Sequence, residues 1–329
     1  MIYPWKFVRK IRENLKNLLD VVWFRVFLAI AIAYILMLSV SQIEQWNRQN
    51  FVCGVEDSKI ECFYKQLSTV ITLENIEGFS ILAAATLFLL ESRERRRNSI
   101  YEAWQVIDNA ASANVSTSFA RVKALQDLNK YGVSLKGLDV PGAYLSEIYL
   151  ANAQLNFADL SRTNMTYANL KEANLCDAQL EGTNLSRASL REANLTYANL
   201  NSAQLEGANL LRANLSYADL SSTDMGNVNL KDAKLNYANL NGSMLEGAFM
   251  GDANLSFAQL EGSDLAGAQL EGACLQYASL LDANLNQANI KNVDFTGAVN
   301  LTPEQLKSAT NWRLAKYDQE LQHRLGILI

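Results

Sequence analysis

The stretch LTYANLNSAQLEGANLLRANLSYADL, residues 195–220, repeats with a period of five. Leucine stands at its first position and at every fifth position up to Leu220, and alanine stands two positions before each leucine from Leu200 onward. Leucines five apart would turn by about 140° each on an α-helix and would alternate between the two faces of a β-strand. Neither element buries them all, whereas a coil with four sides of five residues points every leucine at its axis. The period therefore predicts a solenoid with 20 residues in each coil.

The same repeat continues through 33 units, whose central residues run from Leu135 to Phe295. Leucine occupies 27 of the 33 centres, alanine occupies 23 of the 33 positions two residues earlier, and no charged residue occupies either position. No proline lies between Pro141 and Pro303, so every backbone N–H is available for bonding between coils. The pattern predicts a narrow apolar core. Roughly eight coils at strand spacing would form a rod on the order of 40 Å long.

Units such as ANLSYADLSS, residues 213–222, resemble the pentapeptide-repeat family, whose motif is A(D/N)LXX. The resemblance covers residues 133–297 and implies a mainly β fold, the right-handed quadrilateral β-helix, with the central residue and the preceding small residue inside. The sequences YEAWQVID, residues 101–108, and LTPEQLKSATNW, residues 301–312, look like those of cyanobacterial membrane-anchored members. This further resemblance implies a location in the plasma or thylakoid membrane.

Two apolar runs before the repeats predict a membrane anchor in residues 1–97, with transmembrane helices at about 22–41 and 70–90. A cleaved signal peptide is the alternative for the first run, but the segment before it is long and a second run follows. Lysines and arginines precede the first run and follow the second, and acidic residues dominate the loop 42–69 between the runs. This charge distribution predicts that the loop lies outside and that both termini and the repeats are cytoplasmic.

Three groups of residues in this anchor are candidate sites. Two acidic residues share a helix face near the second run, either in the headgroup zone or as a pair facing a pore: Glu74 and Glu77. A basic cluster after that run is expected to face anionic lipid: Arg93, Arg95, Arg96 and Arg97. Two cysteines fall in the outside loop, where we hypothesise a disulfide: Cys53 and Cys62.

Helical segments are expected at both ends of the repeats. Residues 98–132 form a predicted helical linker and N-terminal cap, whose apolar stripe includes Phe119, Val122, Leu125 and Leu128. Residues 298–329 form a predicted C-terminal capping helix, which begins with a capping box at Thr302, Pro303 and Gln305. Four apolar residues are expected to close that end of the rod: Leu306, Ala309, Trp312 and Leu314.

The sequence offers little for catalysis. His323 is the single histidine, no cysteine and histidine group has metal-ligand spacing, and no phosphate-binding glycine loop occurs. The repeat carboxylates are expected on a convex surface, where nothing excludes water from a pair of them. We therefore predict that the protein is not an enzyme and has no catalytic, cofactor-binding or metal-binding residues.

The outward surface of the rod is the expected place for specificity. An aromatic residue recurs at 20-residue spacing, interrupted by Asp177, and would form one stripe: Phe157, Tyr197, Tyr217, Tyr237, Phe257 and Tyr277. The stripe is interpreted either as structural stacking between coils or as a surface that docks another protein. Residues 133–297 contain 18 acidic and nine basic residues, a net charge of −9, so no nucleic-acid partner is expected.

These features together predict a membrane-anchored rod that presents a cytoplasmic scaffolding surface. Its predicted partners are membrane lipids and an unidentified protein, and association into a homo-oligomer is left open. One alternative is a two-span channel or transport component that assembles around the Glu74 and Glu77 carboxylates. The other follows from the family resemblance, since that family includes acidic DNA mimics that bind type II topoisomerases.

Overall fold

The computed structural model describes residues 22–48, 58, 62, 76–113 and 115–327. The chain divides into two compact units, Met1–Tyr101 and Glu102–Ile329.

The first unit contains helix α2 (Val22–Arg48) and the first part of helix α4 (Ile76–Ser112). Ala29 and Ala33 are buried in α2, and small side chains of this kind let helix backbones approach closely. The Thr86 hydroxyl of α4 donates a hydrogen bond to the Ala29 carbonyl at 3.2 Å. An ion pair between Arg25 and Glu94 adds a second link between the two helices.

The two predicted transmembrane helices are not confirmed. Among the helices that the structure describes, none is both long enough and apolar enough to cross a membrane. The first predicted span, 22–41, lies within α2, which continues to Arg48. The second was expected to begin at 70, but 70–75 lie outside the described residues, and α4 continues past the expected end to Ser112.

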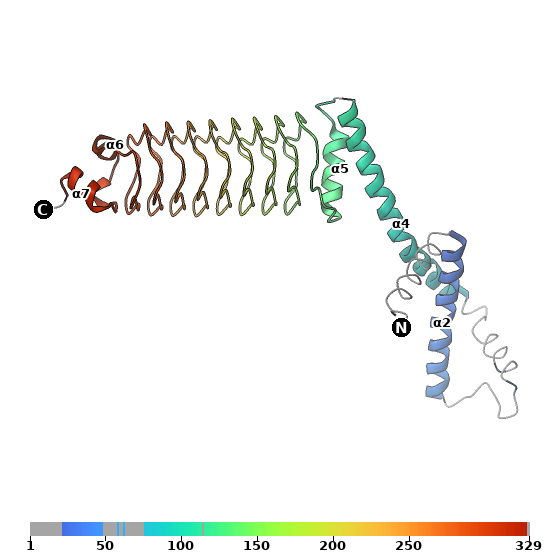
Figure 1. Cartoon of the computed structure of the whole chain (residues 1–329). Coiled ribbons are helices and arrows are strands. Elements are labelled where there is room, and N and C mark those ends of the chain that lie inside the picture. The colour runs from blue at the N-terminus through green and yellow to red at the C-terminus, as the bar shows by residue number, and fades with distance from the viewer. Residues whose placement is uncertain (1–21, 49–57, 59–61, 63–75, 114, 328–329) are drawn as a thin grey trace, which may run out of the picture. The chain divides into compact units, whose positions relative to one another are not determined.

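The second unit contains the repeats, which form a stack of coils between α5 (Phe119–Lys130) and α6 (Pro303–Ser308) (Figure 1). Residues 20 apart pair in parallel bridges, from Asp139 with Asp159 to Ser279 with Val299. The coil length of 20 residues is therefore confirmed. Each bridge is isolated, so the described part of the rod is built from turns and single-residue bridges and contains no continuous strand.

The interior of the rod follows the predicted pattern. All central residues from Leu135 to Phe295 are at most 2% exposed. Where a hydroxyl residue replaces the inward alanine, it is also buried and donates to a leucine carbonyl at 2.6–2.8 Å. These bonds satisfy the buried hydroxyl groups, which would otherwise be costly. The residues are Thr163, Thr183, Thr223, Ser243 and Ser263.

Each five-residue repeat ends in a tight corner. The second residue after each centre has positive φ, as Tyr197 does at 59°, and the next amide bonds back to the centre, as Ala198 N–H does to the Leu195 carbonyl at 3.0 Å. These are features of a type II turn. The Asn or Asp before the centre accepts from the amide two residues later, as Asn214 does from Ser216 at 3.2 Å. This turn-forming bond explains why Asn and Asp recur at that position.

The N-terminal cap is α5, which begins after Ser118. Leu125 and Leu128 are buried, as predicted, and Gly132 ends the segment with a positive φ of 68°. Phe119 is 87% exposed, so its assignment to the apolar stripe was wrong. It is the first residue of α5, and its ring is left in solvent.

The C-terminal cap begins with the predicted capping box, which is confirmed between Thr302 and Gln305. The Gln305 side-chain amide also donates to the carbonyls of Leu280 and Ala283 at 3.1 and 2.9 Å. These carbonyls belong to the last coil, and no further coil follows that could supply backbone N–H donors to it. Gln305 therefore caps the rod as well as the helix.

The remainder of the tail differs from the single helix that was expected. A 3-10 turn (Trp312–Leu314) and helix α7 (Gln319–Leu325) follow α6. Leu314 is 56% exposed and does not close the rod. The ring of Tyr317 takes that place, because it is buried and stacks on Phe295 with 5.8 Å between ring centroids. Burial raises the pKa of the Tyr317 hydroxyl, which donates to the Trp312 carbonyl at 2.6 Å.

Candidate functional site

Five aromatic rings form a continuous ladder along one corner of the rod. The centroid distance is 4.9 Å from Tyr197 to Tyr217 and from Tyr217 to Tyr237. It is 4.7 Å from Tyr237 to Phe257 and 4.9 Å from Phe257 to Tyr277. The rings are within 21° of parallel. We refer to these five residues as the aromatic ladder.

The backbone sets this arrangement. Every ladder residue occupies the positive-φ position of its corner, at 58° to 61°, so all five side chains leave the rod in the same direction. Successive coils repeat at strand spacing, about 4.8 Å, which is close to the separation of stacked rings. The rings remain 43–54% exposed. The ladder therefore gains from stacking and still presents apolar surface to solvent.

The ladder has a defined beginning and end. At its C-terminal end, a Cβ placed on Gly297 would lie 2.5 Å from Cε1 of Tyr277, so only glycine leaves room for the last ring. At its N-terminal end Asp177 separates Tyr197 from Phe157. Phe157 instead lies beneath the Lys136 ammonium, 5.1 Å from its ring centroid. Of the six predicted stripe residues, the structure thus brings five together and leaves Phe157 apart.

Most side chains beside the ladder are polar but uncharged. The residues immediately before the five rings are Thr196, Ser216, Asn236, Ser256 and Gln276. Two residues after the rings stand Asn199, Asp219, Asn239, Gln259 and Ser279. Only Asp219 in these two sets is charged. An aromatic centre with few charges around it resembles the core of a protein–protein interface.

Charges gather on other corners. A shallow hollow of about 520 Å³ is lined by three acids, Glu206, Asp224 and Glu246, together with Asn227. Ion pairs between coils include Lys291 with Glu271 at 2.7 Å. Across the described part of the chain, no three acidic, cysteine or histidine side chains are arranged to hold a metal ion.

The cysteines fall into two groups. Cys62 is disulfide-bonded, but its expected partner Cys53 lies outside the described residues, so their pairing stays a prediction. Cys176 and Cys274 are free. Burial raises the pKa of the Cys176 thiol to about 11, aided by its hydrogen bond to Asp177 and that carboxylate's charge. A thiol held protonated in this way is a poor nucleophile.

The other predicted site residues remain dispersed or undescribed. Glu77 is exposed in the first turn of α4, and Glu74 lies outside the described residues, so the carboxylate pair stays a prediction. Arg95 bonds Glu91 at 3.1 Å and lies 4.4 Å over the ring of Phe88. Two more members of the basic cluster, Arg96 and Arg97, are exposed, while the side chain of Arg93 is not described; His323 is exposed on α7.

Two features were absent from the sequence prediction. Tyr167 and Arg187 occupy corners on successive coils, and a guanidinium N–H of Arg187 donates to the Tyr167 hydroxyl at 2.7 Å. Their spacing of 20 residues is the signal that identifies this contact. Arg121 is buried near the N-terminal end of the rod, and no sequence spacing indicates its surroundings.

The geometry defines a quadrilateral β-helical rod with capped ends, and comparison with known proteins places it in a family. The sequence profile described as "Pentapeptide repeats" matches in eight copies, over residues 143–178, 168–212, 213–252 and 263–299. HetL, a pentapeptide repeat protein involved in heterocyst differentiation regulation from the cyanobacterium Nostoc sp. strain PCC 7120, is 32% identical. That match covers 56% of this chain and 86% of HetL, with a TM-score of 0.24. The chain belongs to the pentapeptide repeat family, whose members fold as right-handed quadrilateral β-helices.

Two further solved structures are also similar to this chain. A pentapeptide repeat protein from the Arabidopsis thaliana thylakoid lumen is 30% identical over 30% of this chain and 68% of that protein, with a TM-score of 0.29. QnrB1, a plasmid-mediated fluoroquinolone resistance protein, is 17% identical over 58% of this chain and 91% of QnrB1, with a TM-score of 0.28. No curated protein matches the sequence significantly.

Proposed function

We propose that the rod is a non-catalytic surface for binding another protein and that the aromatic ladder is its docking stripe. The observation that carries this proposal is the run of five stacked rings, each 43–54% exposed, on a mostly uncharged side of an acidic rod. Aromatic side chains dominate the energetics of many interfaces, and charged residues are depleted at interface cores.

The dimensions of the ladder suit a secondary-structure element of a partner. Four spacings of 4.7–4.9 Å give a stripe roughly 20 Å long, which is close to the length of four turns of an α-helix. The rings are held by stacking, so little side-chain entropy remains to be lost on binding. Because the repeats carry a net charge of −9, the partner is a protein with an apolar ridge and neutral or basic residues beside it.

Photo-crosslinking tests this proposal. A benzoylphenylalanine placed at Tyr217 in the full chain is expected to crosslink a protein in native membranes, and the same residue at Tyr167 is not. Tyr167 is a matched control because it also occupies a positive-φ corner and is 54% exposed, but it lies outside the ladder. Equal crosslinking from the two positions, or none from Tyr217, would contradict a docking stripe. A second copy of this chain among the products would identify self-association.

We further propose that residues 1–97 attach the rod to the plasma or thylakoid membrane, with both termini cytoplasmic and the loop 42–69 outside. The support is the pair of apolar runs and the charges that flank them. Five large apolar side chains of α2 and α4 are also at least 60% exposed: Phe27, Ile35, Ile81, Phe88 and Leu89. Alkaline carbonate extraction is expected to leave the full chain in the membrane pellet, and release into the supernatant would contradict the attachment.

The two other candidate functions have no specific observation in their favour. A channel would depend on the Glu74 and Glu77 carboxylates, and only exposed Glu77 lies within the described residues. A DNA mimic needs a dense array of charge, about one for each 1.7 Å of duplex axis, whereas the repeats carry a net charge of −9.

A further inference from the structure

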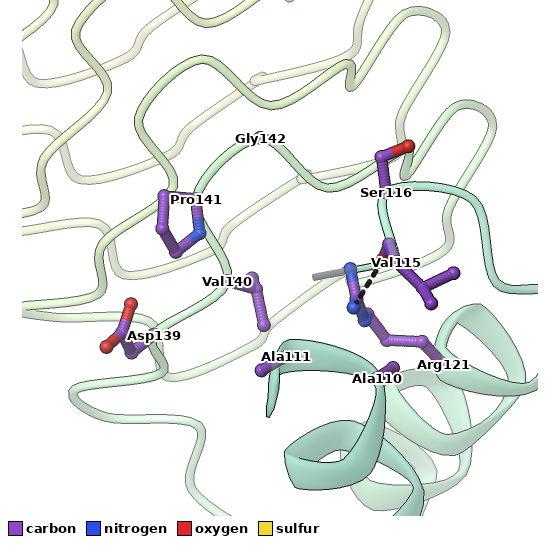
Figure 2. Close-up of a pocket in the computed structure, with 9 residues that line it drawn as sticks. All are labelled: Ala110, Ala111, Val115, Ser116, Arg121, Asp139, Val140, Pro141 and Gly142. Carbon is purple, nitrogen blue, oxygen red and sulfur yellow. Dashed lines mark hydrogen bonds between the residues drawn. The ribbon is translucent and has the colours of Figure 1, made fainter. Parts of the chain in front are cut away.

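We propose that a pocket at the N-terminal end of the rod binds a small oxyanion, a phosphate or carboxylate group, through Arg121. The pocket has a volume of about 270 Å³ and lies between the end of α4, the segment before α5, α5 itself and the first coil (Figure 2). It is lined by Ala111, Ser116, Arg121, Asp139, Val140 and Gly142, among others.

Arg121 is buried without a compensating charge. Only 3% of the residue is exposed, and one terminal nitrogen of the guanidinium donates to the Val115 carbonyl at 2.7 Å. Its Nε is buried and has no hydrogen-bond partner. Figure 2 shows Arg121 and Asp139 on opposite sides of the pocket with Val140 between them, and no ion pair joins Arg121 to any acidic residue that the structure describes.

A buried guanidinium in this state is costly. Burial lowers the pKa of Arg121, because it disfavours the charged form, but an arginine side chain still keeps its proton in a protein. An uncompensated buried charge is strongly destabilising. Arg25, which is also buried, forms an ion pair with Glu94, whereas no ion pair is found for Arg121 in the described part of the chain. A buried guanidinium that lines a pocket without a counter-charge points to an anion that completes the site.

The chemistry and size of the pocket limit the ligand. A guanidinium offers parallel N–H donors that match two oxygens of a carboxylate or phosphate group. The pocket volume falls just below the range of about 300–1,000 Å³ typical of drug-sized ligands, which favours a small anion. Asp139 on the pocket wall disfavours nucleotides and other ligands with several phosphate groups by like-charge repulsion.

Occupancy would strengthen the N-terminal cap. The pocket walls come from α4, α5 and the first coil, and Arg121 already joins α5 to the segment before it through the Val115 carbonyl. A bound anion would neutralise the charge that these elements bury. Ligand binding to the folded state alone raises stability by mass action. The anion is therefore expected to stabilise the junction between α4, α5 and the rod.

Hydrogen exchange of the full chain tests this inference. At constant ionic strength, replacing chloride by inorganic phosphate is expected to slow exchange of the amides in 115–128 by roughly fivefold or more once phosphate exceeds its Kd several-fold. An accompanying rise in Tm of roughly 2–4 °C is expected. A parallel titration with acetate distinguishes a carboxylate site from a phosphate site. The anion that slows exchange at the lower concentration identifies the ligand class. No response to either anion would overturn the inference.

Matched variants assign the effect to Arg121. Arg121→Gln is expected to abolish the response to the anion, whereas Arg212→Gln, which removes an exposed guanidinium from a corner of the rod, keeps it. An equal response in Arg121→Gln would overturn the assignment. Should Arg121→Gln fail to fold, equilibrium dialysis of the unmodified chain against radiolabelled phosphate and acetate decides the matter, because an absence of saturable binding for both refutes the site.

Discussion

The inward positions and the corner positions of the rod repeat with the same period but obey different rules. Every central position is at most 2% exposed and carries an apolar residue. The corners share one backbone conformation with positive φ, yet they carry Gly, Asp, Asn, Glu, Ser, Arg, Tyr, Phe and Gln. The interior therefore selects side chains by packing, whereas the corner tolerates almost any side chain at a modest backbone cost.

This difference shows where the chain has freedom to encode function. Positive φ favours glycine, and Asn or Asp among other residues, so the backbone conformation of a corner does not itself favour aromatic residues, although stacking between coils does. Five aromatic residues in register on one corner therefore occur where the local backbone conformation does not favour them.

Truncating one inward leucine is expected to have the largest effect. Leu215→Ala leaves a cavity in a fully buried core and is expected to lower the free energy of unfolding by about 2–5 kcal/mol, as measured by chemical denaturation. Leu281→Ala removes the same atoms from an outward position that is 47% exposed, so it is expected to change stability by less than about 1 kcal/mol. Equal losses would show that inward and outward positions are not distinct.

Glycine is expected to matter more at the corner beside the last ring of the ladder than at an ordinary corner. Gly297→Ala combines a positive φ of 74° with a clash against the Tyr277 ring, so we expect a loss of about 2–3 kcal/mol. At Gly267, where φ is 66° and no atom lies within 4 Å of a built Cβ, the same substitution costs only about 1 kcal/mol. Thermal unfolding of both variants measures the difference, and similar losses would contradict the packing of Tyr277 over Gly297.

The stability that the C-terminal cap gains from the Asp294 carboxylate is expected to depend on pH. Burial alone would raise the pKa of Asp294, but hydrogen bonds from Lys316, Thr296 and Gln276 outweigh it and hold that pKa well below its usual range. Because the folded pKa is the lower one, this stabilisation is complete above about pH 4 and is lost as the pH falls further.

We therefore expect Asp294→Asn to reduce the free energy of unfolding at pH 7 by about 1–2 kcal/mol. The difference between this variant and the unmodified chain is expected to shrink as the pH falls from 4 towards 2, as followed by thermal unfolding. A difference that stays constant over this range would show that the carboxylate charge is not responsible.

The smallest expected effect is a gain in stability. Asp177 interrupts the series between Phe157 and Tyr197 at a corner with a φ of 56°, close to that of the ladder residues. Asp177→Tyr is expected to join Phe157 to the ladder and to stabilise the rod by about 0.5–1.5 kcal/mol, as measured by chemical denaturation. The loss of the hydrogen bond from the Cys176 thiol subtracts little, because thiols are weak donors. No gain would mean that stacking does not extend beyond the observed ladder.

The interior of the rod was predictable because its signal is local and repeated. Leu200 and Leu215 could be placed inside from spacing alone, and the 20-residue register of Tyr197 and Tyr217 followed from the length of one coil. The capping box at Thr302 was equally local, since both of its hydrogen bonds join residues three apart.

The ends of the rod were less predictable because their packing depends on contacts distant in sequence. Leu314 was expected to close the rod, but Ala309 ends α6 in an extended conformation and the chain then brings Tyr317 over Phe295. The burial of Arg121 depends likewise on how α4, α5 and the first coil meet. No spacing in the sequence encodes that junction.

We propose that the corner aromatic residues serve binding more than folding. Binding and stability can both be measured in one variant, Tyr217→Asn with Tyr237→Asn, because asparagine already occupies other positive-φ corners such as Asn227. The measurement is capture of the partner from native membranes with an added chemical crosslinker, normalised to folded protein, with Tyr167→Asn as the control. We predict that capture falls at least tenfold while Tm falls by only a few degrees, as the loss of ring stacking implies. Capture that is unchanged in the double variant, with a lowered Tm, would contradict the claim and leave the ladder a structural device.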